Sequence, residues 1–295
     1  MISISDRIDY YMGNVSKKEK PELAQNGYDV PIELNLENYK NNYRIIHPNT
    51  AYPPDVARYL GFAGSENLII QCGDSPYRSH ARWPVLVKTR DTLYSSNTQG
   101  VITNLNSMRH WGDVFKHTDT PWNSKLSEFV WRGADTGGDG HRLRFVTKYG
   151  PSHNVGFSGF VQDALESPYL YSRGMIKKVI PIDEMLRYKY LPVIDGNDKS
   201  SSLGWVMASN SVPLMPEPRF HSWVCEPWLK AGEHYVAIKD DYSDFDEQIQ
   251  WCRDHDDECK TIAQNGKEFM LQFTNPLRES HLEEKLIDRV ICLAH

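Results

Sequence analysis

Short apolar runs, each followed by turn-forming residues, recur along the first third of the chain. β-branched and aromatic residues within a run favour a strand, and Gly, Pro, Asp or Ser after it favours a turn. The runs predict strands at residues 43–47, 68–72, 84–89 and 101–104. A helix is predicted at 53–60, whereas the first 45 residues predict one helix and then loops. Strands alternating with helices indicate a mostly parallel α/β sheet.

A second set of elements follows Pro121–Ser124, which marks a candidate boundary. Further strands are predicted at 128–132, 178–182, 190–194, 212–215 and 235–238, and residues 142–149 fit either a helix or a strand. Helices are predicted from about Leu203, from the N-cap Ser243 to about 254, and at 257–273. The last helix is well marked, because Asn275 can cap it, Pro276 suits its first position, and apolar residues from Leu282 onward share one face.

Composition narrows the class of protein. A chain of 295 residues suits two domains, and 40% hydrophobic with 24% charged residues is typical of a globular protein. The net charge of −6 and the scattered Lys and Arg argue against a nucleic-acid partner. Five cysteines without C-x-x-C spacing, no apolar run of bilayer length and no signal peptide predict a cytoplasmic protein without a membrane span.

Two polar loops are candidates for binding phosphate. The loop Asp195–Ser202 joins a predicted strand to a predicted helix, and Lys199 adds a positive charge. Backbone N–H groups at a helix start attract anions. A glycine-rich loop at 133–141 lies between Arg132 and Arg142, whose planar guanidinium groups suit phosphate oxygens. Together they point to a diphosphate at the carboxyl ends of strands. Either loop could instead be a plain turn, with Arg132 in a surface ion pair.

Three blocks of sequence together resemble glycosyltransferase family 90. They are Val130–Ala134, Tyr190–Pro216 and Ser222–Val236, and the resemblance covers about residues 68–270. This family includes protein O-glucosyltransferases and capsule xylosyltransferases. The short chain is most similar to the compact members from bacteria and large DNA viruses, viral xylosyltransferases among them.

The resemblance implies an α/β fold of the GT-B type, with two Rossmann-like lobes facing each other across a cleft. Residues 1–125, joined by the helix at 275–295, would bind the acceptor, and 126–274 would bind the donor. The reaction would invert the anomeric carbon and transfer a sugar, xylose before glucose, from a UDP-sugar to a glycan or glycoprotein without a metal. The donor-binding residues would be Arg132, Gly133, Arg142, Gly196, Asn197, Asp198, Lys199, Ser200, Ser201 and Glu226.

Asp74 matches the position of the family's catalytic aspartate, at the end of the predicted strand 68–72. Inversion by direct displacement needs one carboxylate to take the proton of the acceptor hydroxyl. The alternative is that Asp74 only caps its turn. Relatives carry a basic residue in or after the diphosphate loop, where this chain has Ser202 and Gly204, and Lys199 is the candidate replacement.

Other residues carry weaker expectations. Trp83, His110 and Trp111 are candidates for contact with the sugar acceptor, although a single tryptophan is more often a core residue. The acidic runs at 240–241 and 254–258 fit solvated helix starts, so no metal site is expected. A non-catalytic glycan-binding protein is the main alternative. A glycoside hydrolase is a further one, needing two carboxylates and no nucleotide.

Overall fold

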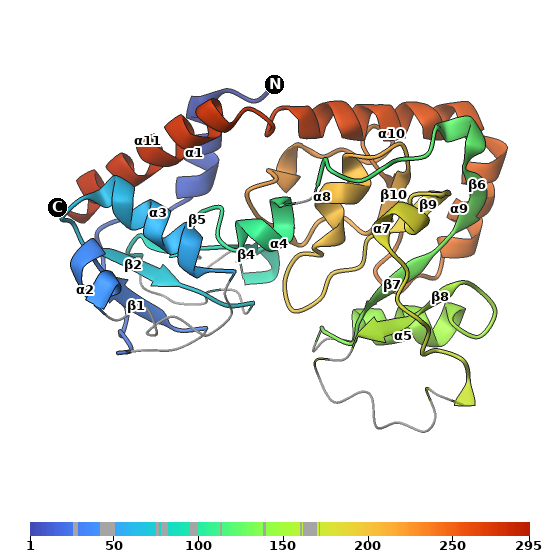
Figure 1. Cartoon of the computed structure of the whole chain (residues 1–295), viewed down its shortest axis with the longest axis horizontal. Helices are drawn as coiled ribbons and strands as arrows, with labels where there is room; N and C mark the ends of the chain where they lie inside the picture. Colours follow the sequence, from blue (N-terminus) through green and yellow to red (C-terminus); the bar gives the residue numbers. More distant parts are fainter. Residues whose placement is uncertain are drawn as a thin grey trace. The chain divides into compact units, whose positions relative to one another are not determined.

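The computed structural model divides the chain into two compact units (Figure 1). Unit 1 consists of Met1–Gly112, Arg219–Pro227 and Gln272–His295, and unit 2 of Asp113–Pro218 and Trp228–Leu271. The structure describes residues 1–25, 29–41, 51–74, 77, 82–94, 100–112, 114–137, 140–159, 161, 170 and 172–295. The mixed α/β class with parallel sheets is confirmed.

Unit 1 contains a four-stranded sheet in the order β1-β2-β3-β5. Its strands are β1 (Pro31–Leu34), β2 (Leu68–Gln71), β3 (Val85–Val87) and β5 (Val101–Ile102). The last three are parallel, and β1 runs antiparallel to β2. The predicted strands at 68–72, 84–89 and 101–104 are confirmed, although each is shorter than expected. Strand β1 was not predicted, and the predicted strand at 43–47 lies outside the described residues.

Helices pack around this sheet. They are α1 (Ile4–Met12), α2 (Leu36–Asn41), α3 (Pro53–Ala63), α4 (Ser107–Trp111) and α11 (Pro276–Ala294). Helix α11 confirms its prediction, because Asn275 Oδ1 accepts hydrogen bonds from the backbone N–H groups of Leu277 and Arg278. Its buried face packs against α3 and α1 (Figure 1). A short antiparallel pair, β4 (Arg90–Asp91) with β11 (Phe220–His221), ties the segment at 219–227 into unit 1.

Unit 2 contains a parallel sheet in the order β12-β10-β9-β6. These strands are β6 (Leu126–Phe129), β9 (Tyr188–Pro192), β10 (Val212–Met215) and β12 (Val236–Ala237). A separate parallel pair consists of β7 (Trp131–Ala134) and β8 (Val155–Gly159). An aromatic core, which includes Phe129, Trp131 and Phe145, packs edge to face between these elements and α5 (His141–Tyr149).

Helices complete unit 2. They are α5, α7 (Ile182–Met185), α8 (Ser202–Met207), α9 (Phe245–Asp254) and α10 (Asp256–Leu271). The ambiguous segment at 142–149 is therefore helical. The strand predicted at 178–182 is wrong, because Val179 is 70% exposed and Pro181 instead precedes α7. The cap predicted at Ser243 is also wrong, since Asp244 occupies that position and its carboxylate accepts from Lys239 N.

Candidate active site

In unit 1, Asp74 lies three residues beyond β2, at the carboxyl end of a parallel strand. Its Oδ1 accepts hydrogen bonds from Lys88 Nζ and, at 3.4 Å, from Tyr52 Oη. Its Oδ2 accepts from the Arg109 guanidinium at 3.3 Å. Lys88 directly follows β3, the next strand of the sheet. Two neighbouring parallel strands therefore bring an acid and a base together at one sheet edge.

The Asp74 carboxyl is largely buried but reaches solvent, since its side chain is 24% exposed. Burial raises the pKa of Asp74, whereas the charges of Lys88 and Arg109 lower it by more, so the pKa lies below its ordinary value of 3.8. The side chain of Lys88 is only 4% exposed, whereas that of Arg109 is 49% exposed. Asp74 is thus a carboxylate whose Oδ1 is held by the buried Lys88 and whose Oδ2 faces the half-exposed Arg109.

The backbone around Asp74 is tightly held. Gly73 has φ of 144°, and a Cβ atom there would lie 1.9 Å from Asp29 Oδ1, so the position requires glycine. Tyr52 Oη donates to the carbonyl of Gly73 at 2.8 Å. Helix α4, which carries Arg109, is anchored at its start by Asp55, whose carboxylate accepts from the N–H and hydroxyl of Ser107.

Tyr52 and Lys88 were not predicted from the sequence. Lys88 falls inside the predicted strand 84–89, and the carboxyl ends of adjacent parallel strands share an edge. That rule could have placed Lys88 beside Asp74. Tyr52 precedes helix α3, and no sequence pattern links it to Asp74.

In unit 2, Arg142 joins the two candidate phosphate loops. It lies in α5, and its guanidinium donates to the carbonyls of Ala134, Ile194 and Asp195 at 3.1–3.3 Å, and to Thr136 Oγ1 at 2.6 Å. A Cβ atom at Gly196 would lie 2.7 Å from that hydroxyl, so only glycine fits beside it.

A second side-chain hydrogen bond connects the two loops. Asn197 Oδ1 accepts from the backbone N–H of Gly137 at 3.0 Å. Hydrogen bonds from Arg142 and to Asn197 therefore connect the described part of the glycine-rich loop to the Asp195–Ser202 loop.

Some of the backbone N–H groups of the Asp195–Ser202 loop donate hydrogen bonds to other residues of the same loop. The N–H groups of Gly196 and Ser200 donate to the carbonyl of Asp198 and the carboxylate of Asp195. Asp198, Lys199 and Ser200 are buried. Ser201 is the N-cap residue of α8, and its hydroxyl makes no capping hydrogen bond. These internal hydrogen bonds fix the conformation of the loop before α8, and Ser201 lies directly before the first residue of that helix.

Three predicted donor residues have other local surroundings. Arg132 donates to Asn154 and to the carbonyl of Lys178, and among the described residues it makes no hydrogen bond to the Asp195–Ser202 loop. Gly133 lies in β7 against the ring of Trp131. Glu226 belongs to unit 1, whereas the other predicted donor residues belong to unit 2.

Glu226 is buried and held mainly by Ser222. Ser222 donates to it from both its N–H, at 2.6 Å, and its hydroxyl, at 2.5 Å. Tyr10 Oη approaches the same carboxylate at 3.5 Å. The carboxylate therefore closes the turn between β11 and the short helix Glu226–Trp228.

The predicted acceptor residues do not share one place in unit 1. His110 and Trp111 belong to α4, where Trp111 lies 5.3 Å from the Phe273 ring. Trp83 precedes β3, and thus lies at the amino end of the strand whose carboxyl end leads to Lys88. Trp83 lines a separate pocket, whereas Arg109 of α4 contacts Asp74.

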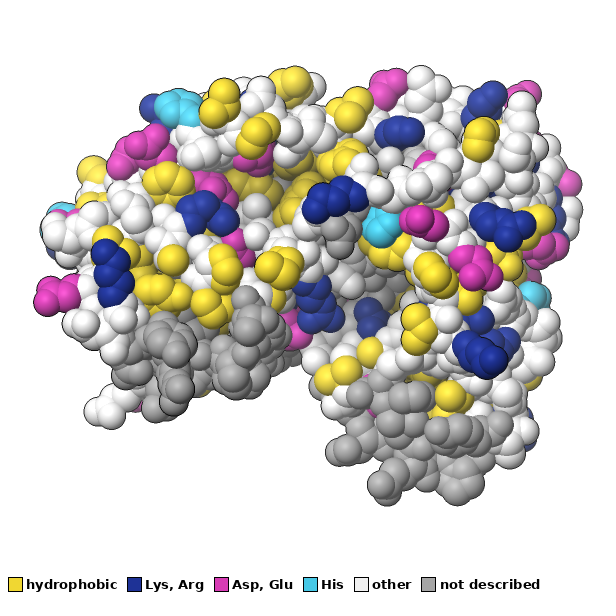
Figure 2. Space-filling model, in the orientation of Figure 1, with side chains coloured by type: hydrophobic (Ala, Val, Ile, Leu, Met, Phe, Trp, Pro, Cys, Tyr) yellow, Lys and Arg dark blue, Asp and Glu magenta, His cyan; other side chains and the backbone are white. Residues whose placement is uncertain are grey.

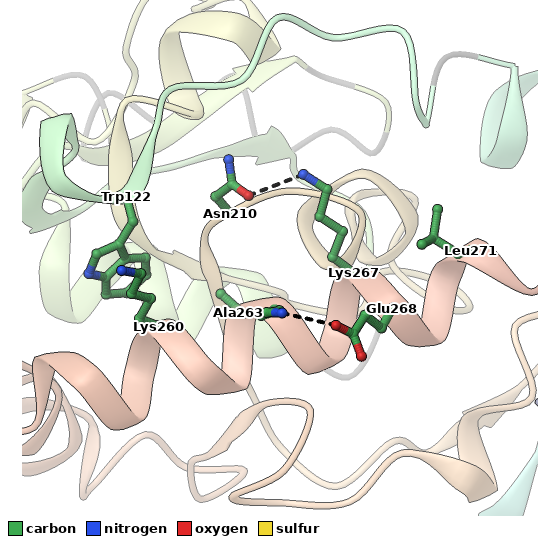
Figure 3. Close-up of a pocket in the computed structure, with 8 residues that line it drawn as sticks. Trp122, Asn210, Lys260, Ala263, Lys267, Glu268 and Leu271 are labelled. Carbon is green, nitrogen blue, oxygen red and sulfur yellow. Dashed lines mark hydrogen bonds between the residues drawn. The ribbon is translucent and has the colours of Figure 1, made fainter.

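Unit 2 contains a hollow of about 400 Å³ along one face of α10 (Figure 3). Lys267 points toward Asn210, and its ammonium donates to the Asn210 amide oxygen at 3.1 Å. Trp122 and Asn210 precede β6 and β10, so this hollow lies at the amino ends of the sheet. It is not at the edge that carries the candidate phosphate loops.

Figure 2 shows Lys and Arg side chains interspersed with Asp and Glu over the described surface of the face drawn. Within the described ranges, no group of three or more His, Cys, Asp or Glu side chains could hold a metal ion. Among the helices of the described chain, none has the length and apolar character needed to cross a bilayer.

The family model "Glycosyl transferase family 90" matches residues 97–276. The O-glucosyltransferase LpsA of Dichelobacter nodosus is 34% identical over 197 residues, covering 66% of this chain and 58% of LpsA. Protein O-glucosyltransferase 2 of Danio rerio is 30% identical over 162 residues, covering 52% of this chain and 30% of that protein. The chain thus spans less than two thirds of either relative.

An uncharacterized protein, 179R, of Invertebrate iridescent virus 6 is 29% identical over 198 residues, covering 56% of this chain and 16% of that protein. Among solved structures, a sucrose-phosphate synthase from Thermosynechococcus elongatus aligns with 88% of this chain and 66% of its own, at 11% identity and a TM-score of 0.42. A score of this size does not establish a shared fold.

Proposed function

Since this chain belongs to glycosyl transferase family 90, we propose that it is an inverting glycosyltransferase that moves a sugar from a UDP-sugar to a hydroxyl of a glycan or glycoprotein. Unit 1 would bind the acceptor and unit 2 the donor, in a GT-B arrangement. The observation that carries the proposal is Asp74, a carboxylate held at a sheet edge with one oxygen toward the half-exposed Arg109. The names of the relatives favour glucose as the first donor to test, with xylose as the competitor.

In the proposed step, the acceptor hydroxyl displaces Arg109 and donates its hydrogen bond to Asp74 Oδ2. The acceptor oxygen then forms a bond to the anomeric carbon while the bond from that carbon to the diphosphate oxygen breaks. The proton passes to Asp74, and UDP leaves with the electron pair. Lys88 holds Oδ1, so the carboxylate stays ionised and oriented. No metal is required, and unchanged transfer in the presence of EDTA tests that point.

A panel of UDP-sugars tests the donor directly. A ligand that binds only the folded protein adds about 2.7 kcal/mol to the free energy of unfolding at a hundred times its Kd, and it therefore raises the melting temperature. UDP and either UDP-glucose or UDP-xylose are expected to raise the melting temperature more than ADP-glucose does. Transfer of radiolabelled sugar then separates an enzyme from a glycan-binding protein. A panel without any shift would contradict the donor assignment.

Replacing Lys88 by methionine is expected to move the acid limb of the transfer rate to higher pH. Lys88 lowers the pKa of Asp74, so its loss raises that pKa, and a higher pH is then needed to ionise the base. The pH profile of kcat/KM measures the shift, with the exposed Lys285→Met as the control. An unmoved acid limb would mean that Asp74 is not the titrating base.

The lowered pKa of Asp74 also sets how its contribution to the stability of the fold changes with pH. Because the pKa of Asp74 is lowered in the folded state, its ionised form stabilises the fold above the ordinary value of 3.8, and this contribution is lost as the pH falls through the lower folded pKa.

Lys199→Ala is expected to weaken UDP binding several-fold, since Lys199 is the proposed replacement for the family's basic residue in the diphosphate loop. Isothermal titration calorimetry measures the change, and Lys285→Ala in unit 1 is the control. Unchanged affinity would contradict this role of Lys199.

A further inference from the structure

A pocket of about 240 Å³ opens in unit 1 at the amino ends of β2 and β3. It is lined by Glu33 of β1, by Ser65, Glu66 and Asn67 before β2, by Ile69, by Trp83 before β3, and by Ile291, Ala294 and His295 at the end of α11. Asp74 and Lys88 lie beyond the carboxyl ends of the same two strands. A strand of four residues separates the two edges by about 10 Å, so this pocket is separate from the Asp74 site.

Trp83 forms the apolar wall of the pocket. Its half-buried indole packs against the cluster of Ile69, Val85 and Val87, which fixes the ring. The ammonium of Lys20 lies 5.8 Å from the ring centroid and pairs with Glu33. A rigid aromatic side chain that remains partly exposed offers a flat apolar surface at little entropic cost.

The polar wall offers both donors and acceptors. Glu66 Oε2 pairs with His295, and among the described residues Glu66 Oε1 accepts no hydrogen bond. Asn67 Oδ1 accepts from Asn35, and within the described ranges its Nδ2 group donates to no residue. The Glu33 carboxylate pairs with the Lys20 ammonium, and the Glu66 carboxylate is hydrogen-bonded to the His295 imidazole.

A flat apolar surface beside a carboxylate acceptor, an amide donor and a serine hydroxyl matches a sugar ring, whose C–H face is apolar and whose hydroxyls both donate and accept. An anionic ligand would meet two carboxylates, and a cationic one would compete with Lys20 for Glu33. We propose that this pocket binds one neutral sugar residue of a glycan, at a subsite remote from the Asp74 carboxylate. The proposal rests on the proposed function for the nature of the glycan.

The experiment is saturation-transfer NMR with methyl β-glucopyranoside and methyl β-xylopyranoside as probes. Wild-type protein and Asp74→Asn are both expected to give a saturation-transfer signal with at least one probe. Trp83→Ala is expected to lose most of that signal, and Glu66→Gln part of it. Trp251→Ala, which removes a partly buried indole from unit 2, is the control and should retain the signal.

Two outcomes would overturn the subsite: no signal with the wild-type protein, or an unchanged signal in Trp83→Ala, whatever the signal of Asp74→Asn. Trp83→Phe keeps an aromatic wall and should retain most of the signal, which guards against misfolding of the alanine variant. The readout is binding without a donor, so it is independent of the transfer assay. Loss of transfer in Asp74→Asn supports the proposed function whether or not the subsite exists.

Discussion

Replacing Asp74 by asparagine is expected to lower the rate of sugar transfer by about 10²–10⁴-fold, the usual worth of a general base. Asparagine keeps the shape of the side chain, but it cannot take the proton of the acceptor hydroxyl. Affinity for UDP should stay unchanged, because the proposed nucleotide loops belong to unit 2 and Asp74 belongs to unit 1. Transfer of radiolabelled sugar and calorimetry with UDP measure the two quantities on the same preparation.

The variant also leaves the Lys88 ammonium without its carboxylate, and Lys88 is buried. A buried charge that loses its partner is destabilising, so lost activity could reflect lost structure. The double variant Asp74→Asn with Lys88→Met removes both charges and should regain thermal stability without regaining transfer. The exposed Asp9→Asn of α1 is the control and should keep normal activity. Normal turnover by Asp74→Asn would contradict the catalytic role and leave Asp74 as a residue that only caps its turn.

Local signals in the sequence were sufficient to predict an element where the residue types at its end favour one structure strongly. Asn275 followed by Pro276 predicted the start of α11, because the amide side chain caps a helix and proline suits its first position. The strand at 68–72 with Asp74 beyond it was likewise readable, since a buried apolar run ended in Gly and Asp.

Local signals failed where tertiary contacts decide. Residues 178–182 have the apolar character of a strand, but no neighbouring strand pairs with them among the described residues, and Val179 faces solvent. Glu226 was grouped with unit 2 by its position in the sequence. The chain enters unit 1 at 219–227 and leaves it again, and no composition shift marks either crossing. Nor did the sequence indicate that the Arg142 guanidinium donates both to the Ile194 carbonyl and to the Thr136 hydroxyl, and its contact with phosphate stays a prediction.

Arg142→Ala is therefore expected to act on the architecture of unit 2 as well as on the donor. Its guanidinium satisfies the carbonyls of Ala134, Ile194 and Asp195 and the hydroxyl of Thr136. Hydrogen bonds from a charged group are each worth about 1.5–3 kcal/mol, and orphaned buried carbonyls add to the loss. With compensation by water at this half-buried site, we expect a loss in unfolding free energy on the order of 3 kcal/mol.

Chemical denaturation measures this loss, and calorimetry with UDP is expected to show at least about tenfold weaker binding, which corresponds to 1.4 kcal/mol. Arg144→Ala, an exposed position in the same helix, is the control and should stay within about 0.5 kcal/mol of wild type. Arg142→Lys separates charge from geometry: lysine keeps the charge but lacks the planar fork that reaches several acceptors at once. If Arg142→Lys had the UDP affinity of the wild type, donor binding would require the positive charge and not the hydrogen bonds by which Arg142 connects the two loops.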